Sequence, residues 1–114
     1  MGDSIAEVTH YHAHFYYQLE EKEHALSVNE LLREELGNEI RVSTLRLVPV
    51  GPHPTPSFEV VFAIDQLEIV RNRFEQKRGG NTVLIHPLME DEVIGHRDYG
   101  EWLGSKLPLD YSVL

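Results

Sequence analysis

Residues 10–17 read HYHAHFYY, and this segment has the alternating pattern of a β-strand. Successive side chains of a strand point to opposite faces of its sheet. One face would carry the polar set His10, His12, His14 and Tyr16. The other face would carry Tyr11, Ala13, Phe15 and Tyr17, which suit a hydrophobic core. The segment therefore predicts a central strand with a row of histidines on its open face.

The rest of the chain adds helices and strands in a recognisable order. Hydrophobic periodicity and proline and glycine positions predict a helix at 19–38, strands at 40–48 and 57–64, a helix from 65 to 79, and a strand at 81–88. The order β-α-β-β-α-β is typical of an α+β ferredoxin-like sandwich, a four-stranded antiparallel sheet of order 4-1-3-2 with two helices on one face. We expect residues 1–114 to form a single domain, because this length supports one core.

A C-terminal extension follows this unit from Met89 onward. We expect a short helix near the segment RDYGEWLG, residues 97–104, and an extended end after it. The sheet face opposite the helices would still be open, and aromatic and aliphatic side chains there would be exposed to water. A homodimer is the usual remedy, so we predict one.

Composition limits the function. The 114 residues carry 19 acidic and 10 basic side chains, a formal net charge of −9, which opposes binding to nucleic acids. Cysteine is absent, so a metal site would use nitrogen and oxygen ligands. No apolar run reaches the roughly 20 residues that span a bilayer, and residues 1–10 do not resemble a secretory signal. We therefore predict a cytoplasmic protein that binds neither nucleic acid nor membrane.

Strand order indicates where the histidines would meet. We expect the first strand to run parallel to the strand at 57–64 and antiparallel to the strand at 81–88. The start of the first strand, the loop that carries His53, and His86 would then share one edge of the sheet. Alternation places His86 and Glu59 on the open face with His12 and His14. The sequence thus predicts a group of imidazoles with one carboxylate.

This set of side chains is typical of a mononuclear metal site. Imidazole and carboxylate ligands suit Fe(II), Mn(II) or Zn(II), and two histidines with one carboxylate are the pattern of iron oxygenases. The spacing alone does not choose among these metals. The simpler interpretation is an amphipathic strand whose polar side happens to be histidine, with His53 as a loop residue between two prolines and His86 as a strand end.

Several motifs resemble those of the bacterial and fungal DOPA 4,5-dioxygenases, extradiol ring-cleaving enzymes with a ferredoxin-like fold. The resemblance covers nearly the whole chain, with Met89 as a mild departure. It rests on YHAHFYY at 11–17, VGPHP at 50–54, FEVVF at 58–62, VLIHPLMEDEVIGHRDYGEWLG at 83–104 and the ending LPLDYSVL. It implies a non-haem metal-dependent dioxygenase that cleaves a DOPA-like catechol with O₂. Fe(II) is the favoured metal, with Mn(II) or Zn(II) as alternatives.

The resemblance also implies roles for individual residues. The histidines that match its motifs are His12, His14, His53 and His86, and we expect three of them to bind the metal. The remaining histidine, Glu59 or His96 would be candidates for proton transfer. An aromatic pocket would be lined by Tyr16, Tyr99 and Trp102.

Two other functions fit the same residues. One is a non-catalytic dimeric module that binds a small aromatic molecule or a metal without turnover. The other is a hydrolase-like zinc site. The sequence does not distinguish which catechol is used, which ring bond is cut, or which three histidines bind.

Overall fold

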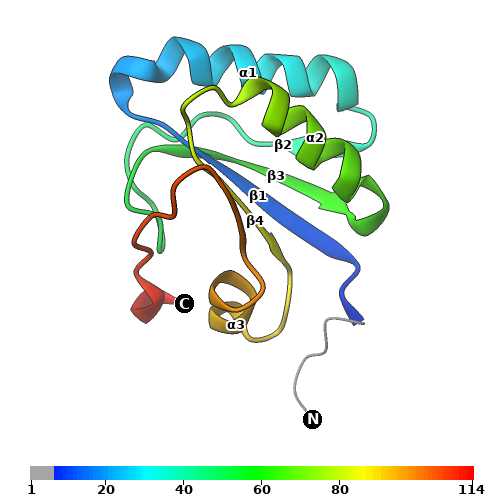
Figure 1. Cartoon of the computed structure of the whole chain (residues 1–114), viewed down its shortest axis with the longest axis vertical. Coiled ribbons are helices and arrows are strands. Elements are labelled where there is room, and N and C mark those ends of the chain that lie inside the picture. Colours follow the sequence, from blue (N-terminus) through cyan, green and yellow to red (C-terminus); the bar gives the residue numbers. More distant parts are fainter. Residues whose placement is uncertain (1–6) are drawn as a thin grey trace.

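A computed structural model of the protein describes residues 7–114 and contains one five-stranded sheet (Figure 1). The strands lie in the order β2-β3-β1-β4-β5, and every neighbouring pair is antiparallel. Their bounds are β1 His10–Tyr16, β2 Ile40–Val42, β3 Ser57–Ala63, β4 Val83–Pro87 and β5 Glu101–Leu103.

Two long helices cover one face of the sheet, and the C-terminal part of the chain lies on the other side (Figure 1). The covering helices are α1 (Lys22–Leu36) and α2 (Leu67–Lys77). The short helix α3 (Glu92–Arg97) and a final 3₁₀ turn, η4 (Tyr111–Val113), belong to the C-terminal part. The histidine face is therefore partly covered by the protein's own tail.

The hydrophobic core lies between the sheet and these two helices. Helix α1 contributes residues spaced by three and four positions, which is the spacing of one helical face. The buried core side chains include Ala25, Val28, Leu32 and Leu36 from α1, Val70 and Phe74 from α2, and Ala13, Phe15, Phe58, Val60, Phe62, Val83 and Ile85 from the sheet. The predicted assignment of faces is confirmed, because these strand residues alternate with the histidines and with Glu59.

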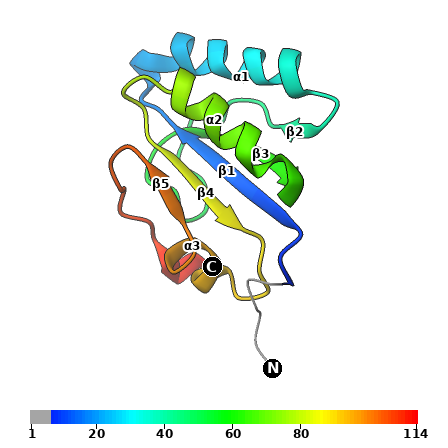
Figure 2. The ribbon, with the colours of Figure 1, turned by 45° about the vertical axis from the view of Figure 1, so that its right-hand side comes forward.

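The predicted strand order is confirmed for the first four strands, and two other predictions about the sheet are wrong. The sheet has five strands and not four, because β5 pairs with the outer edge of β4 (Figure 2). Strand β1 is antiparallel to β3, not parallel to it. The helix α1 returns the chain so that β1 and β2 run the same way, and β3 lies between them antiparallel to both.

The antiparallel pairing changes how His53 reaches the other histidines. The start of β3 meets the end of β1, with Ser57 opposite Tyr16, while the start of β1 meets the end of β3. The loop that carries His53 is therefore placed beside Tyr16 and His14, and not beside His10. His53 does lie near the other histidines, as predicted, but the prediction that its loop lies beside the start of the first strand is wrong.

The tail also differs from its prediction. The helix expected at 97–104 is wrong, because α3 ends at Arg97 and residues 101–103 form β5. Leu103 lies opposite Val83 and is buried with the core, so Trp102 points to the histidine face. Three alternating residues are too few to show a strand by periodicity, and the free edge of β4 decides their structure.

The second predicted strand is shorter than expected. Regular pairing of β2 ends at Val42, and a single bridge between Arg46 and Ser57 follows. Within residues 7–114, no helix is long and apolar enough to cross a membrane. Residues 1–6, which form part of the segment judged not to be a secretory signal, lie outside the described residues.

Candidate metal site

Five histidines from four parts of the chain gather on the open face of the sheet. His12 and His14 come from β1, His86 from β4, His53 from the loop before β3, and His96 from α3. His12 and His86 lie opposite each other in the β1–β4 register, and the rings of His86 and His96 stack with centroids 3.7 Å apart. We call these five residues the histidine cluster.

The cluster contains two overlapping groups that could hold a metal ion. The first group is His12, His14 and His86, and the second is His14, His53 and His96. In each group, one possible ligand atom per residue lies within 4.8 Å of the others. His14 belongs to both groups, so it is the centre of the arrangement.

Hydrogen bonds fix the protonation of two rings. His86 Nδ1 lies 3.1 Å from the Pro87 carbonyl oxygen, and His96 Nδ1 lies 2.7 Å from the Glu92 carbonyl oxygen. A carbonyl oxygen can only accept, so each Nδ1 carries the proton and each Nε2 has a free lone pair. An N–H donated to a backbone carbonyl is also the usual outer contact of a metal-binding histidine.

His14 and His86 bring two possible ligand atoms together. Their Nε2 atoms lie 2.9 Å apart, and His86 Nε2 can only accept. The His14 Nδ1 atom is buried and has no partner in residues 7–114, whichever nitrogen of the ring carries the proton. Two imidazole nitrogen atoms at this separation are close enough to share one ion, and imidazole is a usual ligand of Fe, Mn and Zn, so the donor set fits a metal.

Burial favours the neutral form of His14, His53 and His86. Desolvation, with repulsion from other cluster imidazoles, lowers the pKa of His14 well below its usual value. Desolvation and then His96 lower the pKa of His53 to about 4 and that of His86 to about 3. Since metals bind the neutral form of imidazole, the cluster is prepared for a metal at neutral pH.

A carboxylate lies at the exposed rim of the cluster. Glu59 Oε1 is 3.4 Å from His12 Nε2, and Glu59 Oε2 is 3.6 Å from Arg46 Nη1. Desolvation lowers the pKa of His12, and the negative charge of Glu59 opposes this shift. Glu59 is thus placed to orient the His12 ring, and the sequence predicted its face correctly.

A buried tyrosine holds His53. Tyr16 Oη lies 2.7 Å from His53 Nδ1, and the Tyr16 ring stacks with Trp102 at a centroid distance of 6.1 Å. Burial raises the pKa of the Tyr16 phenol, which stays protonated and can donate to Nδ1. The alternation of the first strand already put Tyr16 on the histidine face, but only the tertiary structure shows this hydrogen bond.

Some of the residues that the sequence singled out lie at the cluster, and others lie away from it. All six predicted site residues, the five cluster histidines and Glu59, are brought together. Of the predicted aromatic pocket, Tyr16 and Trp102 lie at the cluster, whereas Tyr99 is 46% exposed. His10 is exposed and contacts Thr9, and His24 contacts the Arg78 carbonyl. Arg46 also lies at the rim of the cluster beside Glu59, and no sequence motif marked it.

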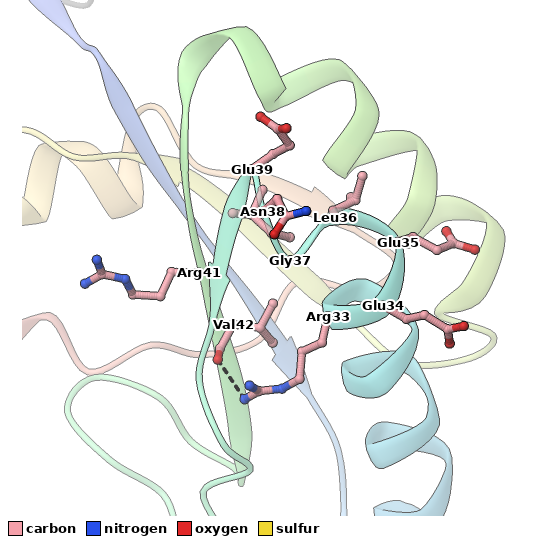
Figure 3. Close-up of a pocket in the computed structure, with 10 residues that line it drawn as sticks. Arg33, Glu34, Glu35, Leu36, Gly37, Asn38, Glu39, Arg41 and Val42 are labelled. Carbon is pink, nitrogen blue, oxygen red and sulfur yellow. Dashed lines mark hydrogen bonds between the residues drawn. The ribbon is translucent and has the colours of Figure 1, made fainter.

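A separate cavity at the end of α1 lacks a comparable group of metal-binding side chains. It has a volume of about 520 Å³ and is lined by residues 33–42, none of which is histidine (Figure 3). Its Arg33 side chain already donates to the Val42 carbonyl at 2.7 Å. The histidine cluster is therefore the stronger candidate site.

The fold and the cluster define a small α+β protein with a histidine site suited to a metal ion. Comparison with known proteins identifies its family. The chain belongs to the Dopa 4,5-dioxygenase family, whose model matches residues 11–113. The resemblance seen in the sequence motifs is thereby confirmed.

Individual relatives agree with this assignment. The chain is 30% identical to a DOPA 4,5-dioxygenase of Amanita muscaria, over 96% of this chain and 51% of that protein. It is 33% identical to an uncharacterized 21.2 kDa protein of Botryotinia fuckeliana, over 89% of this chain and 61% of that protein. The chain thus spans about half to three fifths of the length of these relatives.

A solved structure has the same architecture. A crystal structure of a protein from Nostoc punctiforme, whose description as a dioxygenase is provisional, superposes with a TM-score of 0.82. The two chains are 29% identical, and the match covers 97% of this chain and 95% of the other. The five-stranded fold is therefore close to one already observed by experiment.

Proposed function

We propose that this protein is a metal-dependent extradiol dioxygenase that opens the ring of a catechol with O₂. The observation that carries the proposal is the cluster of largely buried histidines on the open sheet face of a chain from this family. Fe(II) is the favoured metal, because nitrogen ligands with a nearby carboxylate suit non-haem iron. Mn(II) and Zn(II) are the alternatives.

His12, His14 and His86 form the proposed ligand set. They stand on two adjacent central strands, so the sheet holds their backbones rigidly, and His12 lies directly opposite His86. Outer contacts are present for two of them, the Pro87 carbonyl for His86 and Glu59 for His12. When bound, the metal would supply Lewis-acid polarisation of the catechol oxygens and a site for O₂.

His53 is the proposed proton carrier. The Tyr16 hydroxyl lies 2.7 Å from His53 Nδ1, and in the proposed arrangement it donates to Nδ1, so that Nε2 carries the proton of the neutral ring. The His53 ring centroid is 4.1 Å from that of His14, which places this N–H group beside the ligand set. Three of the four motif histidines are expected to bind the metal, and we propose His53 as the fourth, which does not.

Glu59 and His96, the predicted residues for proton transfer, have more limited proposed roles. Glu59 contacts His12 and Arg46 at the rim, so we assign it to the orientation of His12. His96 stacks on His86 and fixes its own ring through Glu92. It closes one side of the cluster and is the second candidate for a proton carrier.

The experiment is anaerobic loading of the protein with Fe(II), Mn(II) or Zn(II), followed by a panel of catechols and oxygen. The expected result is O₂ uptake together with a yellow ring-opened product. If no catechol gives this product with Fe(II) or Mn(II), the enzyme proposal is wrong. Catechol binding without O₂ uptake would indicate the non-catalytic module, and tight Zn(II) without O₂ uptake would indicate a hydrolase-like zinc site.

The homodimer remains a prediction. Helix α3 and the C-terminal turn cover part of the open face, so the exposure that suggested a dimer is smaller than expected (Figure 2). Exposed apolar side chains are still present on the described surface, among them Leu47, Val48, Leu88 and Val113. Sedimentation equilibrium at micromolar concentration would test the prediction, and a monomer would contradict it.

A further inference from the structure

Arg46 is an anchored side chain at the rim of the histidine cluster. Its backbone N–H donates to the Ser57 carbonyl at 2.9 Å, and the Ser57 N–H donates back at 3.3 Å. The Arg46 carbonyl also accepts a 2.7 Å hydrogen bond from the buried Tyr17 hydroxyl. The backbone is thus fixed on both sides, while 38% of the Arg46 side chain is exposed.

The guanidinium of Arg46 has unused hydrogen-bonding capacity. Its acidic neighbour is Glu59, whose Oε2 lies 3.6 Å from Arg46 Nη1, beyond a good hydrogen bond, and the side chain donates no hydrogen bond within residues 7–114. Several other arginines are paired with a carboxylate, since Arg71 holds Glu101 at 2.8 Å and Arg73 holds Glu35 at 2.7 Å. A guanidinium offers five donors in a planar fork, so most of the Arg46 donors are available to a ligand.

Arg46 supplies a positive side-chain charge at the rim of the cluster. Its guanidinium faces Glu59, which in turn contacts His12, and its charge lowers the pKa of both His12 and His53, so it lies within electrostatic reach of two sides of the cluster. The whole chain carries a formal net charge of −9. An anionic group at this exposed rim would be repelled by the chain as a whole, and Arg46 offers it a local cation.

We propose that Arg46 selects catechols that carry a carboxylate on their side chain, by pairing its guanidinium with that carboxylate. The inference rests on the proposed function, since the histidine cluster must hold the ring end of the same molecule. Arginine suits this task because its fork matches the two oxygens of a carboxylate. Arg46 is thus a specificity residue, and it takes no part in the ring chemistry.

Arg41 provides a matched control. It lies on β2 between Ile40 and Val42, whose side chains join the core, so Arg41 points to the open side of the sheet. Figure 3 shows its side chain on the opposite side of β2 from α1. Arg41 is exposed, as Arg46 partly is, but within residues 7–114 it makes no hydrogen bond or ion pair with the cluster. Removing it changes the net charge by the same amount.

The test compares two catechols that differ only in charge, one with a propionate and one with a propionamide side chain. Arg46→Met should raise KM for the acid roughly 10- to 100-fold, which corresponds to the loss of a charge-assisted pair of hydrogen bonds. The kcat for the acid, and both kcat and KM for the amide, should stay within about twofold of the wild-type values. Arg46→Lys should give an intermediate loss, since it keeps the charge but not the fork. Arg41→Met should behave as the wild type.

A binding measurement separates this inference from the proposed function. The same two catechols are titrated anaerobically into metal-loaded wild type and Arg46→Met, which needs no turnover. If the wild type opens neither catechol, the dioxygenase proposal fails, while a selective loss of acid binding in Arg46→Met would still support the role of Arg46. Equal losses for acid and amide, or the same loss in Arg41→Met, would overturn it.

Discussion

The Nε2 atoms of His14 and His86 lie 2.9 Å apart, although 72 residues separate the two histidines in the chain. The contact exists because β4 pairs with β1 and both residues point to the same sheet face. Neither ring is solvent-exposed, so the two nitrogen atoms share a space from which water is largely removed. The predictions below follow from this arrangement.

His86→Ala should abolish metal binding. It removes one ligand from a proposed set of three and opens the stacked contact with His96. Metal analysis after loading and desalting should fall from about one equivalent per chain to near zero. His10→Ala is the control, because His10 lies on the same strand but is exposed and outside both groups. Full metal content in His86→Ala would refute the site.

His53→Ala should separate the two possible ligand groups. In the proposed set, His53 carries a proton and does not bind the ion, so the variant should keep its metal and lose activity by a factor of roughly 100 or more. His12→Ala should lose the metal. The reverse pattern, metal lost in His53→Ala and kept in His12→Ala, would assign the ion to His14, His53 and His96.

Tyr16→Phe should lower kcat and leave the metal in place. The variant keeps the buried ring and its stacking on Trp102 but loses the hydrogen bond to His53, so the His53 ring is free to rotate. We expect a decrease in kcat of roughly tenfold or more and an altered pH profile. Tyr99→Phe, at an exposed position, is the control. An unchanged pH profile with an unchanged kcat would contradict the positioning role.

The metal-free protein should lose stability as pH falls below about 6.5. The pKa of His53 is lowered to about 4 and that of His86 to about 3, whereas the same groups titrate near 6.5 when unfolded. Between these values the unfolded chain binds more protons than the folded chain, so acid favours unfolding. The free energy of unfolding should change by up to about 1.4 kcal/mol per pH unit for each histidine.

Urea unfolding of chelator-treated protein at several pH values would measure this dependence. The free energy should be level above pH 6.5 and fall towards pH 4, within the window that the two shifts define. His53→Asn should show a shallower slope, because it removes one of the titrating groups. A flat profile from pH 6.5 to about 4.5 would contradict the burial of neutral imidazoles.

Phe74→Ala should destabilise the fold by about 3–5 kcal/mol. Phe74 is fully buried on α2 and contacts the rings of Phe15 and Phe58, so the truncation leaves a cavity between helix and sheet. Ile69→Ala, on the same helix but 36% exposed, should cost much less. Denaturant unfolding monitored by the single tryptophan, Trp102, would compare them. Equal decreases in the free energy of unfolding for the two variants would show that Phe74 does not anchor α2 to the core.

Local patterns were sufficient for the first four strands and the two long helices. The alternation of HYHAHFYY separates Ala13 and Phe15 from His12 and His14, because a strand has a period of two whatever its neighbours are. The spacing of Val28 and Leu32 likewise identifies the buried side of α1. The histidine face and the family followed from these patterns and from the motifs.

Tertiary structure decided the fifth strand and the contacts within the cluster. The element order already predicted an antiparallel sheet, and the pairing of β1 with β3 confirms this against the parallel direction expected for that pair. Strand β5, in contrast, forms because the edge of β4 has unpaired backbone groups, which no short periodic pattern encodes. The Tyr16–His53 bond and the position of Arg46 depend on loops that only packing places. A sequence specifies which side chains share a face, whereas the distances between them are set by how distant segments pack.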